Sequence, residues 1–136
     1  FRNAGSNANG RAISIIVSNT SLYQPRKSSQ NGLSNAFGIV NMDAGVNVML
    51  DVSFQYEDTG EPATLTRFFF SVFDIDEGSG DSGEETLKLS DFETYMRTNP
   101  ADIDVDHSGY NSVLLSSRTP GTNNDNPTDP SQLTDL

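Results

Sequence analysis

The sequence predicts a mostly β protein, an antiparallel β-sandwich or jelly roll with one short helix over residues 91–97. Three observations support this fold class. Two segments alternate apolar and polar residues with the period of a half-buried strand. Turn-forming residues separate the apolar segments at short intervals, as in all-β sandwiches. The 136 residues are also enough for one domain with a single hydrophobic core.

The first predicted strand covers residues 11–18, where Ile13, Ile15 and Val17 share one face. These residues are β-branched, as is common in strands. The second covers residues 45–56 and shows the most regular alternation in the chain. Its apolar face consists of Val46, Val48, Leu50, Val52, Phe54 and Tyr56. Polar residues occupy most of its other face, which predicts an antiparallel strand with one side in water.

Residues 57–62 (EDTGEP) predict a turn, after which residues 63–75 are expected to return as the hairpin partner. A helical reading of this segment stays open, because Leu65, Phe68, Phe69 and Val72 also fit a helical stripe. The Thr, Phe and Val content and the hairpin spacing favour the strand.

The short helix is predicted from a capping box, in which Ser90 and Glu93 can each bond the other's backbone N–H. Phe92, Tyr95 and Met96 follow at helical spacing, and Pro100 ends the pattern. A further strand is expected near 110–116. We therefore assign the β-sandwich domain to 1–116, and a Pro/Asn/Thr-rich extended segment that docks on the same or a neighbouring subunit to 117–136.

The composition narrows the classes of function. A formal net charge of −11 disfavours binding to nucleic acid and to anionic membranes, and favours divalent cations. The absence of Cys excludes disulfides and thiolate metal sites, and the lone His107 excludes a His-rich metal site within one chain. No apolar run is long enough to span a bilayer, so no membrane insertion is expected.

The acidic residues are concentrated after the Phe-rich segment, at Asp74, Asp76, Glu77, Asp81, Glu84, Glu85 and Asp91. Carboxylates at this density repel one another unless a cation lies among them. Calcium takes six to eight oxygen ligands, and an all-protein cage suits magnesium poorly. We predict a Ca²⁺ site with Asp74 and Asp76 on one side of a strand and Glu84 or Glu85 closing it. Asp43 is a candidate extra ligand.

Two alternatives to this site remain. The segment FDIDEGSGDSGEE has some EF-hand spacing, but Gly78, Ser79 and Asp81 occupy positions where an EF-hand has an oxygen ligand, Gly and an apolar residue. The other alternative is a solvated acidic loop that binds no metal.

A glycosylation sequon, Asn19-Thr20-Ser21, follows the first predicted strand. In a protein secreted by a eukaryote, Asn19 would carry an N-linked glycan. The Ser/Thr/Pro-rich C-terminal segment has the composition of an O-glycan acceptor.

The sequence lacks the motifs that mark the common enzyme classes. The paired acids could indicate a glycosidase, but they lie in a polar loop that cannot raise a carboxyl pKa as a general acid requires. There is no nucleophile elbow, phosphate loop or Cys nucleophile. His107 with Ser108 or Ser112 is interpreted as plain surface. We therefore expect no enzymatic activity.

Four segments together resemble a known family: IIVSNTSLYQP, NGLSNAFGIVNMDAGVNVML, FFFSVFDIDEG and GTNNDNPTDPSQLTD. The family consists of extracellular modules in large surface proteins of algae and other protists, some of which build glycosylated filaments or flagellar hairs (mastigonemes). The resemblance covers roughly residues 13–136. It implies a β-sandwich outside the cell, calcium at Asp74 and Asp76, glycosylation and self-assembly.

The chain departs from the family pattern in two places. Family members carry Cys-rich insertions where this chain has only EDTGEP, which puts the lateral contacts in doubt. The family pattern also continues beyond Leu136 with another strand. The chain is therefore expected either to be truncated or to complete a neighbour by strand addition, which would propagate into a filament.

The expected function is thus a structural subunit of an extracellular glycoprotein filament or cell-surface coat, stabilised by Ca²⁺. Its expected partners are copies of itself and N- or O-linked glycans. The alternative is a calcium-dependent glycan-binding module of a secreted protein. Sugar binding only in the presence of calcium would favour the alternative.

Overall fold

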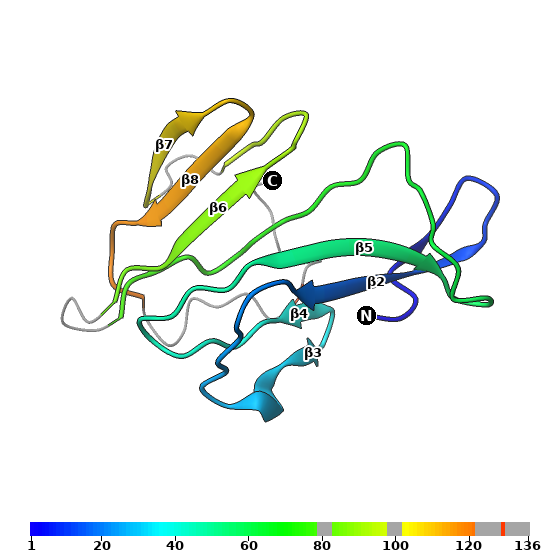
Figure 1. The fold of residues 1–136 in the computed structure, drawn as a ribbon, viewed down its shortest axis with the longest axis horizontal. Helices are drawn as coiled ribbons and strands as arrows, with labels where there is room; N and C mark the ends of the chain where they lie inside the picture. The colour runs from blue at the N-terminus through cyan, green and yellow to red at the C-terminus, as the bar shows by residue number, and fades with distance from the viewer. Residues whose placement is uncertain (79–82, 98–101, 122–128, 130–136) are drawn as a thin grey trace. The chain divides into compact units, whose positions relative to one another are not determined.

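The computed structural model describes residues 1–78, 83–97, 102–121 and 129 (Figure 1). Within these ranges it consists of β-strands and a short 3-10 turn, without an α-helix, and it divides into two compact units, 1–70 and 71–136. The first unit contains β1 (Gly5–Ser6), β2 (Ala12–Asn19), the turn η1 (Ser28–Gln30), β3 (Gly32–Ser34), β4 (Phe37–Ile39) and β5 (Leu50–Tyr56). The second contains β6 (Thr86–Ser90), β7 (Ile103–Gly109) and β8 (Ser112–Ser117). The predicted mostly β fold class is confirmed.

The main sheet of the first unit is antiparallel, in the order β1-β2-β5. Ile13 pairs with Tyr56, Ile15 with Phe54 and Val17 with Val52. Residues directly opposite each other project from the same side of a sheet, so the two predicted apolar rows form one face. The alternation predicted for both strands is confirmed over these residues.

The second predicted strand is shorter than expected, because β5 begins only at Leu50. Before it, Gly45 has a φ of 73°, and the N–H of Met49 donates to the Ser21 hydroxyl at 2.8 Å. A backbone N–H that bonds a side chain is not free to join a ladder. Residues 45–49 therefore approach the sheet as a loop.

The strand predicted over 63–75 is wrong, and the helical reading of that segment is wrong too. Only its entry pairs with β5: Ala63 N–H donates to the Phe54 carbonyl at 2.9 Å, next to a bridge between Gln55 and Pro62. Proline has no N–H to continue such a ladder. The segment instead passes over the apolar face of the sheet, where the rings of Phe68 and Phe54 meet edge to face at 4.7 Å.

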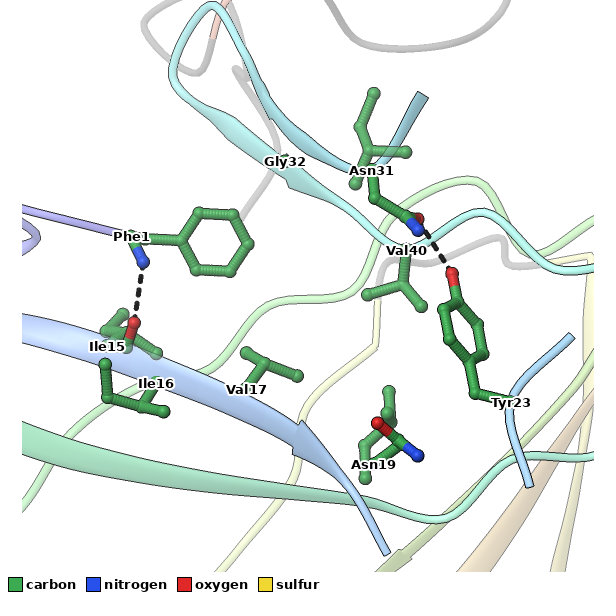
Figure 2. Close-up of a pocket in the computed structure, with 11 residues that line it drawn as sticks. Phe1, Ile15, Ile16, Val17, Asn19, Tyr23, Asn31, Gly32 and Val40 are labelled. Carbon is green, nitrogen blue, oxygen red and sulfur yellow. Dashed lines mark hydrogen bonds between the residues drawn. The ribbon is translucent and has the colours of Figure 1, made fainter. Parts of the chain in front are cut away.

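Phe1 attaches the N-terminal segment to β2 and approaches the β3–β4 hairpin (Figure 2). Its amino group donates to the Ile15 carbonyl at 2.7 Å, and Ile15 N–H donates back to the Phe1 carbonyl at 2.9 Å. The Phe1 ring lies against Gly38, where a Cβ atom would come within 2.7 Å of it. Glycine at position 38 is therefore needed for this contact.

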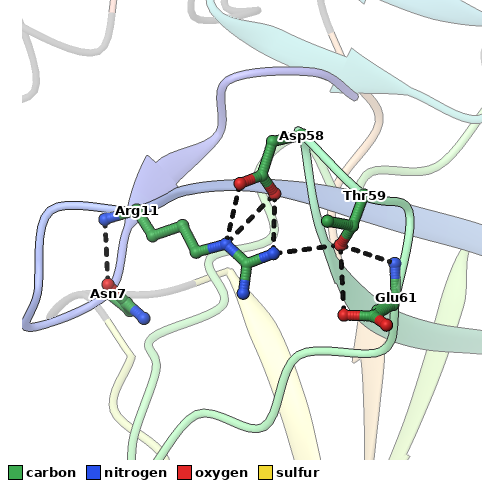
Figure 3. Close-up of polar contacts among 5 residues, drawn as sticks. All are labelled: Asn7, Arg11, Asp58, Thr59 and Glu61. Atoms are coloured by element: carbon green, nitrogen blue, oxygen red, sulfur yellow. Dashed lines mark hydrogen bonds and ion pairs between the residues drawn. The ribbon is translucent and has the colours of Figure 1, made fainter.

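An arginine clamp closes the other end of the main sheet (Figure 3). Arg11 donates through Nε and Nη2 to the Asp58 carboxylate at 2.8–3.1 Å, and through Nη2 to Thr59 Oγ1 at 3.0 Å. Its guanidinium carbon lies 3.7 Å from the centre of the Tyr56 ring, a cation–π arrangement. The clamp joins the residue that precedes β2 to the turn that follows β5.

The sheet of the second unit is also antiparallel, in the order β6-β8-β7. Along β8, Val113, Leu115 and Ser117 are buried while the residues between them are half-buried. Leu115 pairs with Leu87 of β6 and Val105 of β7, so these strands share an apolar face. The strand predicted near 110–116 is confirmed by β8.

The helix predicted over 91–97 is wrong, because these residues have no helical turn in the structure. Asp91 has a φ of 60°, and its N–H donates to the Asn111 carbonyl at 3.1 Å. The Tyr95 hydroxyl is bonded to His107 Nε2 at 3.0 Å. A seven-residue segment gains little from helix formation, since nucleation is costly. Contacts with β7 and with the β7–β8 turn therefore outweigh the local capping signal.

Candidate functional site

The predicted calcium ligands lie on a short hairpin that leads into β6. The Gly78 N–H donates to the Gly83 carbonyl at 2.9 Å, Glu77 and Glu84 form an antiparallel bridge, and the Glu85 N–H donates to the Asp76 carbonyl at 3.2 Å. In this register Asp76 is opposite Glu85. Cross-strand neighbours share a side of the ladder, so the Asp76 and Glu85 side chains lie together, and Glu84 lies on the other side with Glu77.

The Glu85 carboxyl is affected by partial burial and by the negative charges of neighbouring carboxylates. Partial desolvation raises the pKa of the Glu85 carboxyl, and the negative charges of Asp76 and Asp74 raise this pKa further, against a bond to the Asp76 backbone that lowers it. The structure thus places Asp76 beside Glu85, with the charge of Asp74 acting on the same carboxyl, and puts Glu84 on the other side of the hairpin. Asp74 is not in a strand and has a φ of 64°, so the prediction that Asp74 and Asp76 share one side of a strand is wrong. A divalent cation among these carboxylates would remove the repulsion that raises the Glu85 pKa.

The hairpin is held by the segment that follows β8. Glu77 N–H donates to the Thr119 carbonyl and Gly121 N–H donates to the Glu77 carbonyl, both at 2.9 Å. Glu85 N–H also reaches the Ser117 hydroxyl at 3.0 Å. Residues 119–121 therefore bond to the backbone of the hairpin.

Gly121 is the site residue that sequence reasoning missed. The carboxylate of Asp76 occupies the space that a Cβ atom at Gly121 would need. The dipeptide Pro120-Gly121 is typical of a turn but gives no partner, so the sequence alone could not have found this contact.

The described residues contain no group of three or more Asp, Glu, His or Cys side chains placed to hold a metal ion. Asp81 lies outside the described ranges. Asp43, the candidate extra ligand, belongs to the first unit, where its carboxylate accepts the Ala44 N–H at 3.0 Å. The donors of the hairpin are all oxygens, which suit calcium chemically, and the ligand set stays a prediction.

The predicted glycan acceptor, Asn19, is the last residue of β2 and is exposed. It belongs to the only N-linked sequon in the sequence. Its carboxamide nitrogen donates to the Ser21 carbonyl at 2.8 Å. The sequon residues are thus part of the ordered end of the β2–β5 ladder.

Asn19 also lines an open groove of about 330 Å³ (Figure 2). The lining is mainly apolar and comes from the N-terminal segment, β2, the β3–β4 hairpin and the start of β5: Phe1, Ile15, Ile16, Val17, Asn19, Tyr23, Asn31, Gly32, Ile39, Val40 and Leu50. Tyr23 anchors one wall, since its hydroxyl bonds Asn31 Oδ1 at 2.8 Å and the Asn41 carbonyl at 2.5 Å. Sequence reasoning did not anticipate this groove.

His107 contacts the aromatic side chain of Tyr95. Its Nε2 atom is 3.0 Å from the Tyr95 hydroxyl, and both side chains are at the surface. The Phe92 ring meets the Tyr95 ring edge to face at 5.7 Å. The side chain of Ser108 is outside what the structure describes.

No helix in the described parts of the chain has the length and apolar character needed to cross a membrane. Comparison with known proteins finds no matching family model, no similar curated protein and no similar solved structure.

Proposed function

We propose that this protein is a structural subunit of an extracellular glycoprotein filament or surface coat, stabilised by bound calcium. The observation that carries the proposal is the outer edge of β5. No described segment pairs with this edge between Leu50 and Ser53, whereas its far end is bonded to residues 61–63. Leu50 and Val52 are 39% and 36% exposed beside it. An open edge with apolar side chains is a template for strand addition from another copy.

The edges of the second sheet make a useful contrast. The edge strand β7 carries Asp104 and Asp106, both exposed, and β6 carries the exposed Lys88. Charged residues on an edge strand discourage pairing with another chain. β5 itself carries the exposed Asp51, so the preference for its edge rests on Leu50 and Val52, which are exposed there, whereas the apolar residues of β6 and β7 are half-buried.

The proposal includes a β-sandwich architecture, because each three-stranded sheet has one apolar face and one more polar face. It also includes calcium among Asp74, Asp76 and Glu85, where like charges already raise the Glu85 pKa. Calcium that binds only the folded hairpin stabilises it by mass action.

Assembly is tested by Val52→Pro, matched with Val52→Thr. The Val52 N–H points away from β2, on the same edge as the Phe54 carbonyl that Ala63 contacts. Proline removes this outward donor and leaves the β2 ladder bonds in place, while threonine keeps the donor. We expect filaments, seen by electron microscopy with millimolar calcium, from the parent and Val52→Thr only. Filaments of Val52→Pro, with unfolding unchanged, would refute the β5 edge.

The calcium proposal has a separate test. Asp76→Asn should reduce the calcium-dependent rise in Tm relative to EDTA, because Asp76 faces Glu85 across the hairpin. Asp51→Asn on β5 is the matched control, and it should respond to calcium like the parent. An equal response of the parent and Asp76→Asn would remove this site.

A further inference from the structure

The apolar groove of the first unit begins at the predicted glycan acceptor. We propose that the first N-acetylglucosamine of a glycan on Asn19 lies in this groove and covers it. The inference rests on the proposed glycoprotein and adds a structural role for the sugar. It commits the groove to a covalently attached occupant, because Asn19 itself is part of the lining.

The attachment chemistry is compatible with the geometry of Asn19. The Nδ2 atom displaces the diphosphate of a lipid-linked oligosaccharide from C1 of the first sugar and loses one proton. One N–H remains on this nitrogen. That N–H can keep the 2.8 Å bond to the Ser21 carbonyl, which would hold the amide at the rim of the groove.

The lining fits the two apolar parts of the sugar, its acetamido methyl group and the C–H face of its ring. The face of an aromatic ring carries negative partial charge that attracts such C–H groups, and Tyr23 presents a ring in the groove. Val40 and Leu50 are 42% and 39% exposed, so apolar surface remains to be covered. The volume of about 330 Å³ is at the lower end of the range that holds small ligands, about 300–1,000 Å³.

The Tyr23 network keeps the groove open. Asn31 Oδ1 accepts from the Tyr23 hydroxyl and, at 2.6 Å, from the Asn41 N–H. These bonds fix the wall that carries Val40 with respect to Tyr23. A wall fixed in advance lowers the entropy cost of ordering the sugar.

The test uses the full chain secreted from a eukaryotic host. Mass spectrometry measures occupancy at Asn19, and endoglycosidase trims the glycan to one N-acetylglucosamine. We expect Tm to exceed that of Asn19→Gln by on the order of 4 °C, and the trimmed form to keep most of this rise. NMR should show contacts between the acetamido methyl group and the Tyr23 ring.

A matched control moves the glycan within the same unit. The double variant Asn19→Gln, Asn9→Thr creates a sequon at Asn7, which does not line the groove. The Asn9 backbone N–H that bonds Asn7 Oδ1 is retained. A glycan at Asn7 should give neither the rise in Tm nor the NMR contacts.

The outcomes separate this inference from the proposed function. An occupied Asn19 with no rise in Tm and no contact to Tyr23 would overturn the groove proposal and leave the glycoprotein intact. An unoccupied Asn19 would overturn both the groove proposal and the glycan part of the proposed function. The filament and calcium parts depend on the tests of Val52 and Asp76.

Discussion

β8, the central strand of the second sheet, and β5, an edge strand of the first, each turn every second residue toward an apolar face, yet these residues are covered to different extents. In β8, Val113 and Leu115 are 1% and 8% exposed. In β5, Val52 and Leu50 are 36% and 39% exposed. Ile13 of the central strand β2 is 3% exposed, so the degree of cover depends on the strand's place in the sheet as well as on what packs against its face.

The difference extends to the loops beside each sheet. In the first unit, Phe68, Phe69 and Phe70 approach the sheet and line a second, smaller cavity, while remaining 50%, 79% and 54% exposed. Large exposed apolar groups in one region mark an interaction surface more often than a stable free surface. The proposed assembly edge and glycan groove lie in this first unit, and the proposed calcium ligands lie in the second.

The largest expected effect tests this difference in cover directly, with a leucine from each sheet. Leu115→Ala should cost about 2–4 kcal/mol of unfolding free energy, because it leaves a cavity in a buried site. Leu50→Ala should cost about 1 kcal/mol or less, since the side chain is already partly in water. Urea unfolding of both variants measures the two losses.

Equal losses for the two leucines would contradict the comparison. Repeating the measurement at two protein concentrations then shows the cause. A loss at Leu50 that grows with concentration would mean that another copy covers this face.

The next effect concerns two glycines, one in each unit. Gly121→Ala should destabilise the protein by about 1–2 kcal/mol, because its Cβ atom would collide with the Asp76 carboxylate. Gly5→Ala should stay within about 0.5 kcal/mol, since a Cβ atom there meets nothing within 4 Å. Thermal unfolding measures both, and an unchanged Gly121→Ala would show that the Asp76 carboxylate lies elsewhere in solution.

Local sequence patterns predicted some parts of the fold and misled in others. The faces of β2 and β5 followed from alternation, because a register slip would turn every apolar residue to the wrong side. The strand β7 was missed because its sequence, IDVDHSG, is too polar to stand out. The segment 63–75 was wrong because its phenylalanines pack over a sheet and do not extend one, which depends on contacts distant in sequence.

The candidate sites show the same limit. The density of acids predicted a calcium site over this segment, and the structure places two of the predicted ligands, Asp76 and Glu85, opposite each other. The exclusion of Glu84 depends on the register of the hairpin, and the contact of Gly121 with Asp76 joins residues far apart in the chain. Neither can be derived from spacing alone.

A smaller effect is expected from the charge of Glu85, in the acidic hairpin of the second unit. The raised pKa of Glu85 means that the folded state favours the protonated carboxyl. This stabilisation is present below the usual glutamate pKa, about 4.3, and is lost as the pH rises through the raised value. Without calcium, Glu85→Gln should therefore exceed the parent in stability at pH 7 by less than about 1 kcal/mol, because solvent screens an exposed residue.

The difference in stability between Glu85→Gln and the parent should vanish near pH 4, about the usual pKa of glutamate. With calcium at pH 7 the parent should be the more stable of the two if Glu85 is a ligand. Denaturant unfolding across this range, with EDTA or calcium, measures it. Glu84→Gln removes the same charge from the other side of the hairpin and serves as the control. A parent that remains more stable than Glu85→Gln in EDTA at pH 7 would refute the assigned repulsion.

The smallest expected effect concerns two ion pairs between arginine and aspartate, one in each unit. Arg11 forms a fork with Asp58 and lies over Tyr56, whereas Arg118 has one contact with Asp104, at 3.3 Å. Lysine keeps the charge but loses the fork and the ring contact, so Arg11→Lys should lower Tm more than Arg118→Lys.

The bond from Arg11 lowers the pKa of Asp58, so its contribution is present above the usual aspartate pKa and is lost as the pH falls through the lowered value. The Tm difference between the two lysine variants should accordingly shrink in acid. Added salt should also reduce the charge part of it, because both pairs are exposed to solvent. Equal Tm values for the two variants at pH 7 and low salt would mean that the fork over Tyr56 adds nothing to an ordinary surface pair.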